Sequence, residues 1–213
     1  MRTHLVLLLV ALAAGMRAQS PQPAHSLKTF TSPDGVFQFN YSDTLIVCRQ
    51  QKQEWGGYAW VPSANCVSYH AVCDGLTPEK YEGLACLAYP RNQHTDTPAF
   101  EAATFSVEIL EKVATAKTCT AKPDVDVFTS QPPIDIHGVS FVELKYEEAG
   151  MNQSVSGNVY RTFHSGKCYQ LGINTATANA QVFDPPAREM TKRDWADVNR
   201  VLQRARDSFR FLK

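Results

Sequence analysis

Six cysteines downstream of a short apolar N-terminal segment constrain this chain more than any other feature. Residues 5–14 form an unbroken run of ten apolar residues behind the basic Arg2, which is typical of a signal-peptide core and too short to span a membrane. An exported chain with an even number of cysteines favours three disulfides, because thiols persist poorly in an oxidising compartment. We therefore expect a secreted or periplasmic protein whose disulfides use Cys48, Cys66, Cys73, Cys86, Cys119 and Cys168.

The signal and the chain length together predict the domain organisation. We expect a signal peptide over residues 1–18, with Ala18 as the last residue before cleavage and a cut after Gly15 as the alternative. Residues 19–26 contain two prolines and no large apolar residue, which predicts a flexible leader. Residues 27–213 suffice for one domain with a hydrophobic core. The sequence holds no second apolar run of the roughly 18 residues that a membrane span requires.

The sequence predicts that the cysteines form disulfides more clearly than it predicts which cysteines pair. Six cysteines allow 15 pairings, and chain spacing alone does not choose among them. We favour a bond across a short loop for the first pair, and the third pair would close a long loop; no local signal supports the second pair. The corresponding pairs are Cys66 with Cys73, Cys48 with Cys86, and Cys119 with Cys168.

The alternative to disulfides is a zinc site. The spacing Cys66-x-x-x-His70-x-x-Cys73 brings thiolate and imidazole ligands together, and Cys86 or His94 could complete the tetrahedral set that structural zinc needs. Export and the even number of cysteines favour disulfides over this site. We accordingly predict no metal and no other cofactor.

The charge balance bears on the kind of partner. The signal peptide carries two of the 21 basic residues, Arg2 and Arg17, and none of the 21 acidic ones, so the mature chain has a net charge of about −2. Proteins that bind nucleic acids or acidic membranes carry strongly basic surfaces. We therefore expect no nucleic-acid partner, and we consider a protein or carbohydrate ligand instead.

Turn residues and period-two alternation predict strands in the first half of the domain. Pro33-Asp34-Gly35 separates residues 30–31 from 36–41, where aromatic and polar residues alternate, as in a hairpin. The apolar run 84–89 predicts a strand covered on both faces. Residues 103–110 fit both a strand and a helical face, and we favour a strand.

The second half predicts a three-stranded meander followed by a helix. Alternation over 139–147, a turn at 149–152, a strand to about His164 and another over 168–175 make up the meander. Thr191 and Asp194 fit a helix N-terminus. Trp195, Val198, Leu202, Ala205 and Phe209 then recur at helical spacing, which predicts a helix packed on the sheet. We interpret the basic residues near its end as a solvated face, comprising Arg200, Arg204, Arg206 and Arg210.

These patterns resemble a known group of proteins. The hairpin has the form Phe-x-Ser-Pro-Asp-Gly-x-Phe-x-Phe-x-Tyr over residues 30–41, and the long helix leads into Ser208-Phe209-Arg210-Phe211. The outline is similar to the PsbP-like α+β sandwich group and to uncharacterised secreted bacterial proteins with similar cysteine spacing. The resemblance implies an antiparallel sheet with an N-terminal hairpin, a C-terminal meander and a packed C-terminal helix. It also implies an accessory or binding role in place of catalysis.

An aromatic loop is the candidate binding site in the sequence. Trp55, Tyr58 and Trp60 lie in a glycine-containing segment flanked by Cys48 and Cys66. Rigid aromatic faces stack on sugars, peptides or partner proteins, and nearby disulfides would preorganise them. The alternative is that these aromatics fold back onto a small core.

Catalytic signatures are weaker. The sequence has neither Gly-x-Ser-x-Gly nor Ser-x-x-Lys. Glu143, Glu147 and Glu148 could supply the paired carboxylates of a hydrolase, but Glu143 and Glu147 share the strand face opposite Val142, Leu144 and Tyr146, which we predict to be a solvated surface. His164 and Ser165 are adjacent in sequence, so a continuing strand would point them to opposite faces. We therefore predict a non-enzymatic accessory or binding module, with a secreted hydrolase or a structural envelope-associated protein as alternatives.

Overall fold

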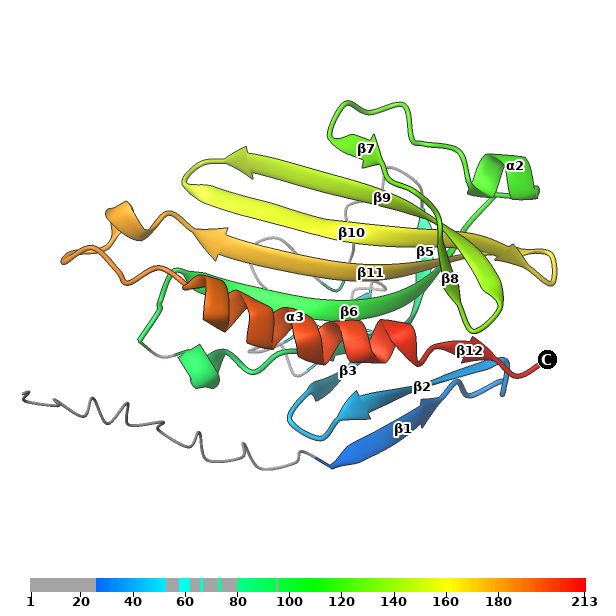
Figure 1. Ribbon diagram of the computed structural model, residues 1–213, viewed down its shortest axis with the longest axis horizontal. Helices are drawn as coiled ribbons and strands as arrows, with labels where there is room; N and C mark the ends of the chain where they lie inside the picture. Colours follow the sequence, from blue (N-terminus) through cyan, green and yellow to red (C-terminus); the bar gives the residue numbers. More distant parts are fainter. Residues whose placement is uncertain (1–25, 53–57, 62–65, 67–72, 74–79, 95) are drawn as a thin grey trace, which may run out of the picture.

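A large antiparallel sheet dominates the computed structural model, which describes residues 26–52, 58–61, 66, 73, 80–94 and 96–213 (Figure 1). The predicted signal peptide and residues 19–25 of the leader lie outside the described residues. The strands follow one another in the order β4 (Tyr58–Val61), β3 (Ile46–Lys52), β5 (Tyr81–Ala88), β6 (Phe100–Leu110), β11 (Lys167–Ala178), β10 (Gln153–His164), β9 (Val139–Gly150) and β7 (Phe128–Ser130), with β8 (Ile134–Ile136) also paired to β9.

The predicted meander is confirmed as β9, β10 and β11. Met151 and Asn152 have positive φ angles of 49° and 64°, and Ser165 and Gly166 have φ angles of 47° and 78°. Such pairs of left-handed residues suit the tight turns that match the twist of antiparallel hairpins. The predicted strands over 84–89 and 103–110 are confirmed as β5 and β6, which are adjacent and lie inside the sheet.

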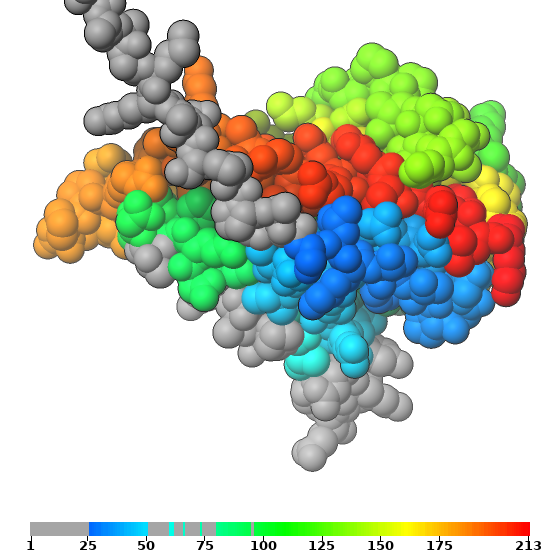
Figure 2. All heavy atoms as spheres, turned by 60° about the horizontal axis from the view of Figure 1, so that its bottom comes forward, coloured from blue at the N-terminus to red at the C-terminus, as the bar shows by residue number. Residues whose placement is uncertain are grey.

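The predicted N-terminal hairpin is confirmed, but it belongs to a second, smaller sheet. β1 (Leu27–Thr31) pairs with β2 (Phe37–Ser42), and the C-terminal strand β12 (Arg210–Phe211) pairs with the other edge of β2. Figure 2 shows this sheet in blue beside the orange and red helix α3 (Lys192–Asp207). Three further helical segments among the described residues are short, namely α2 (Ala116–Cys119), η1 (Arg91–His94) and η2 (Ala180–Val182).

The main core lies between one face of the large sheet and the layer made by α3 and the small sheet. Aromatic side chains from β2, among them Phe39, meet Phe105 of β6 edge to face at 5.2 Å between ring centroids. Val198 and Leu202 of α3 are fully buried in the same cluster. The helix begins with the predicted capping box, in which Thr191 and Asp194 satisfy each other's backbone N–H groups. Within the described residues, no helix has the length and apolar character needed to cross a membrane.

All three disulfides lie on the opposite face of the sheet. Cys48, Cys86 and Ser106 are direct cross-strand partners, and such partners point to the same side of an antiparallel sheet. Their sequence neighbours Leu87 and Phe105 point to the other side, into the core against α3. Cys168 lies opposite Leu110 on the disulfide side. The bonds therefore join Cys66, Cys73 and Cys119 to the face of the sheet away from α3.

The observed pairing corrects two of the three predicted bonds. Cys119–Cys168 is confirmed, whereas the other bonds are Cys48–Cys66 and Cys73–Cys86. Cys48 and Cys86 are opposite each other on β3 and β5, but each bonds to a residue of the segment between these strands. The Sγ atoms of Cys48, Cys73 and Cys86 all lie within 4.8 Å of one another, so Cys48 and Cys86 are close in space without being bonded to each other. Three disulfides indicate an oxidising, extracytoplasmic location.

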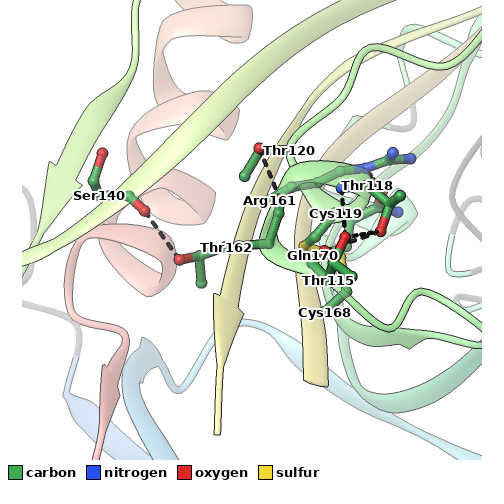
Figure 3. The surroundings of a disulfide bond; sticks show 10 residues. Thr115, Thr118, Cys119, Thr120, Ser140, Arg161, Thr162, Cys168 and Gln170 are labelled. Carbon is green, nitrogen blue, oxygen red and sulfur yellow. Dashed lines mark hydrogen bonds between the residues drawn. A yellow bond between two sulfur atoms is a disulfide. The ribbon is translucent and has the colours of Figure 1, made fainter. Parts of the chain in front are cut away.

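Buried polar groups accompany the disulfides on this face. Arg161 Nε donates to Gln170 Oε1 at 2.8 Å, and Gln170 Nε2 donates to Glu108 Oε2 at 2.8 Å. The three side chains come from the adjacent strands β10, β11 and β6 and are at most 1% exposed. Figure 3 shows Arg161 and Gln170 beside Cys119–Cys168, while the neighbouring Thr162 reaches the carbonyl of Ser140 on the other side of the strand. The chain therefore links Arg161 and Glu108 through an amide instead of leaving either charge alone.

Candidate functional site

A groove lies between α3 and the meander, on the face of the sheet that the helix covers only in part. Its volume is about 410 Å³. Trp195, Asn199 and Gln203 form one wall, and they recur every fourth residue along α3. Side chains four apart share one helix face. This stripe runs beside the buried stripe that contains Val198 and Leu202, so the helix places its amide side chains at the edge of the core.

The floor of the groove comes from β10 and β11. Ser156 and Asn158 alternate with Val155 and Val159, which are buried on the opposite face of the sheet. Ser156 is the cross-strand partner of Thr175, and their hydroxyl oxygens are 3.0 Å apart. The groove therefore has a polar floor backed by an apolar layer. Ile173 and Thr177 complete the β11 side.

Glu143 and Arg206 fix one end of the groove. Asn158 Nδ2 donates to Glu143 Oε1 at 2.7 Å, and it lies 3.3 Å from the hydroxyl of Tyr160. Arg206 Nη1 donates to the same hydroxyl at 2.7 Å, and its guanidinium lies 5.0 Å from the centroid of the Tyr160 ring. Arg206 also forms an ion pair with Asp207 at 2.6 Å. These bonds hold Asn158 and Tyr160 in place before any ligand arrives.

Two predictions from the sequence need correction at this end. Arg206 does not belong to a solvated basic face, because its aliphatic stem and guanidinium pack on Tyr160 and only 16% of its side chain is exposed. Glu143 is not on a wholly wet face, because this side of β9 faces the groove and Glu143 is half-buried against Asn158. Glu147 and Glu148 are exposed, as predicted.

The electrostatics of the groove are mild. Of the described lining residues, Lys145 on β9 carries the only formal charge, and it is exposed. Burial raises the pKa of Tyr160, although the Arg206 guanidinium partly opposes the shift. Tyr160 is therefore neutral at physiological pH. Chemically, the site offers neutral hydroxyls and amides beside the half-buried ring of Trp195.

Trp60 of the aromatic loop predicted from the sequence does not line this groove. Trp60 is 4% exposed and packs among the disulfides Cys48–Cys66 and Cys73–Cys86, so its ring offers no free stacking face. This is the alternative in which an aromatic side chain folds onto a small core. Tyr58 lies in β4, and Trp55 lies outside the described residues. Their role in binding stays a prediction.

The structure also shows the surroundings of the cysteines proposed as zinc ligands and of His164. Cys66, Cys73 and Cys86 are all disulfide-bonded, so they cannot serve as thiolate ligands, and His70 lies outside the described residues. His164 Nε2 is 2.8 Å from the carbonyl oxygen of Lys213, and its ring stacks on Phe211 at 3.8 Å between centroids. His164 therefore anchors the C-terminal strand.

The sequence contained a signal for the groove. The alternation over 155–159 places polar residues on the face opposite two valines, and the stripe Trp195, Asn199, Gln203 recurs at a helical spacing beside the core stripe. What the sequence did not show is that the two faces meet. That juxtaposition depends on where α3 packs across β6 and β11.

Comparison with known proteins yields only distant structural likenesses. No family model and no curated protein matches the sequence. Cyanobacterial PsbP (CyanoP) of Synechocystis is similar at 11% identity and a TM-score of 0.42, covering 92% of this chain and 98% of that chain. LpqN of Mycobacterium tuberculosis, involved in cell envelope biogenesis, has 10% identity, a TM-score of 0.43 and coverage of 87% and 90%. The Ran-binding protein Mog1p of Saccharomyces cerevisiae is similar at 12% identity and a TM-score of 0.43, with coverage of 89% of this chain and 97% of that chain. The similarity to PsbP suggested by the sequence thus recurs in the structure, and at these scores it says nothing about a ligand.

Proposed function

We propose that this protein is a secreted or periplasmic, non-enzymatic binding module that holds a small polar ligand in the groove between α3 and the meander. The groove carries the proposal: a hollow of about 410 Å³ whose floor presents hydroxyl and amide groups between Trp195 and Tyr160. Small-molecule sites typically have volumes of about 300–1,000 Å³ and a few converging polar groups. The size of the groove lies in this range, and its lining supplies the converging polar groups.

The lining favours binding over catalysis. General acid–base chemistry uses a pair of groups with pKa values near the working pH. In the described lining the titratable groups are Lys145 and Tyr160, and burial raises the pKa of Tyr160 further from neutrality. The carboxylate of Glu143 is bonded to a lining residue, because it accepts a hydrogen bond from Asn158. These observations support a site that holds its ligand unchanged.

Ligand-induced stabilisation tests the proposal. A library of saccharides, amino acids, nucleosides and short peptides is screened by thermal shift against the disulfide-intact protein, against Asn199→Leu in the groove, and against Arg193→Leu on the exposed side of α3. We expect a ligand that raises the Tm of the wild type and of Arg193→Leu but not of Asn199→Leu, because a ligand that binds only the folded state stabilises it. Equal stabilisation of all three proteins would place the site elsewhere. Turnover that Glu143→Gln removes without unfolding would show an enzyme.

A further inference from the structure

We infer that the ligand of the groove is an uncharged saccharide. The inference rests on the proposed function and adds a ligand class to it. It follows from three properties of the lining: side-chain amides without a hydrogen-bond partner among the described residues, strands with no free backbone edge, and charges of both signs beside the half-buried indole of Trp195.

The amide side chains of the helix wall are free to bind hydroxyls. Among the described residues, none is hydrogen-bonded to the side-chain amide of Asn199 or Gln203. Each amide offers two donors and one acceptor group, and saccharide hydroxyls both donate and accept. On the floor, the hydroxyls of Ser156 and Thr175 bond to each other and retain acceptor capacity, while Asn158 directs its amide nitrogen to Glu143. The lining therefore mixes donors and acceptors in the way that a polyhydroxylated ligand requires.

The strands of the floor disfavour an extended peptide. Peptides in sheet-lined sites commonly bind by adding a strand to a free edge, where backbone N–H and C=O groups are unpaired. β10 pairs with β9 and β11 along its length, and β11 pairs with β10 and β6. The backbone of the groove floor is thus committed to the sheet, and recognition depends on side chains alone.

The local charge favours a neutral ligand. Lys145 lies between Glu143 and Glu147 on one face of β9, because residues two apart on a strand share a face. Its positive charge is therefore offset by its neighbours. An anionic ligand would meet these carboxylates, and a cationic one would meet Lys145. A ligand with hydroxyls and no net charge avoids both repulsions.

Trp195 supplies the apolar contact that a sugar ring uses. Its ring is half-buried and packs edge to face on Phe100, with 5.9 Å between ring centroids. A fixed indole at the end of a polar groove gives the C–H face of a pyranose a stacking surface at little entropic cost. Tyr160 at the other end is 1% exposed, and Arg206 donates a hydrogen bond to its hydroxyl.

Saturation-transfer NMR and tryptophan fluorescence test this inference on the full disulfide-intact protein. The probes are a panel of neutral, uronic-acid and amino disaccharides. We expect a neutral disaccharide to bind, to change the tryptophan emission, and to bind about tenfold more weakly to Asn199→Leu and to Ser156→Ala, since each loses about one hydrogen bond. Trp195→Phe should abolish the emission change, and Arg193→Leu should bind like the wild type.

The outcomes separate the ligand class from the site. Binding of a neutral disaccharide with Kd constant within about twofold between low and high salt supports the inference, because screening acts on charges. A panel in which only the uronic-acid or amino sugars bind overturns the neutral class. If a peptide or nucleoside binds in the groove and no saccharide binds, the assignment of a saccharide ligand is wrong. The proposal that the protein is a binding module is then still supported. Binding unaffected by Asn199→Leu and Ser156→Ala overturns both proposals.

Discussion

Removal of the Cys119–Cys168 disulfide should destabilise the protein more than removal of either other disulfide. Its two cysteines are 49 residues apart, against 18 and 13 for the other two bonds. On the chain-entropy model, closing the longer loop stabilises by about 4 kcal/mol, because the crosslink removes more conformations from the unfolded chain. The same model gives about 3 kcal/mol for each of the shorter loops, which are closed by Cys48–Cys66 and Cys73–Cys86.

Urea unfolding of double-alanine variants measures the difference. The two variants to compare are Cys119→Ala/Cys168→Ala and Cys73→Ala/Cys86→Ala. Each removes two cysteines that are fully buried, so the free energy lost with their packing is similar in both variants. We expect the first variant to lose about 1 kcal/mol more free energy of unfolding than the second. If the second variant loses as much or more, loop length does not determine the effect, and packing or residual structure in the unfolded chain does.

Three further predictions concern individual side chains. Arg161→Met should cost about 1–3 kcal/mol, because the buried Oε1 of Gln170 loses the donor Arg161 Nε, whereas Arg204→Met on the exposed helix face should change the urea midpoint little. Trp60→Ala should cost about 3–5 kcal/mol in the same assay, and a negligible loss would show that its ring is not in a core. Hydrogen bonds from Thr191 lower the pKa of Asp194 to about 2, below its unfolded value of about 3.9. The stability advantage of the wild type over Asp194→Asn should therefore be complete above about pH 4 and decline as pH falls towards 2; an advantage unchanged at pH 2 would contradict the assignment.

Much of the fold could be predicted because its signals are local. Alternation at Val142, Leu144 and Tyr146 predicts a strand, and the same residues are buried together on one face of β9. Thr191 and Asp194 mark the helix start because a capping box involves residues only three apart. The resulting α+β architecture, with a hairpin, a meander and one packed helix, is the one that the structure shows.

The features that could not be predicted depend on register and on distant contacts. Cys48 bonds to Cys66 although its direct cross-strand partner is Cys86, so the choice of partner is not evident from the spacing of the cysteines. Trp60 is buried because it packs among the cysteines of two disulfides, although a glycine-containing aromatic loop suggests exposure. Arg206 reaches Tyr160 over a separation of 46 residues. The groove likewise combines side chains from β9, β10, β11 and α3, so no single stretch of sequence displays it.

The most direct test of the groove is side-chain amide mapping by NMR. The isotope-labelled, disulfide-intact protein is titrated with the best neutral disaccharide, and the amide signals of Asn158, Asn199 and Gln203 are followed. We predict that these three shift together, with the same dissociation constant, while the amides of the opposite sheet face, including Gln170 and Asn174, do not shift. Shifts confined to residues around Tyr58, or to the disulfide face, would contradict the assignment of the groove as the binding site.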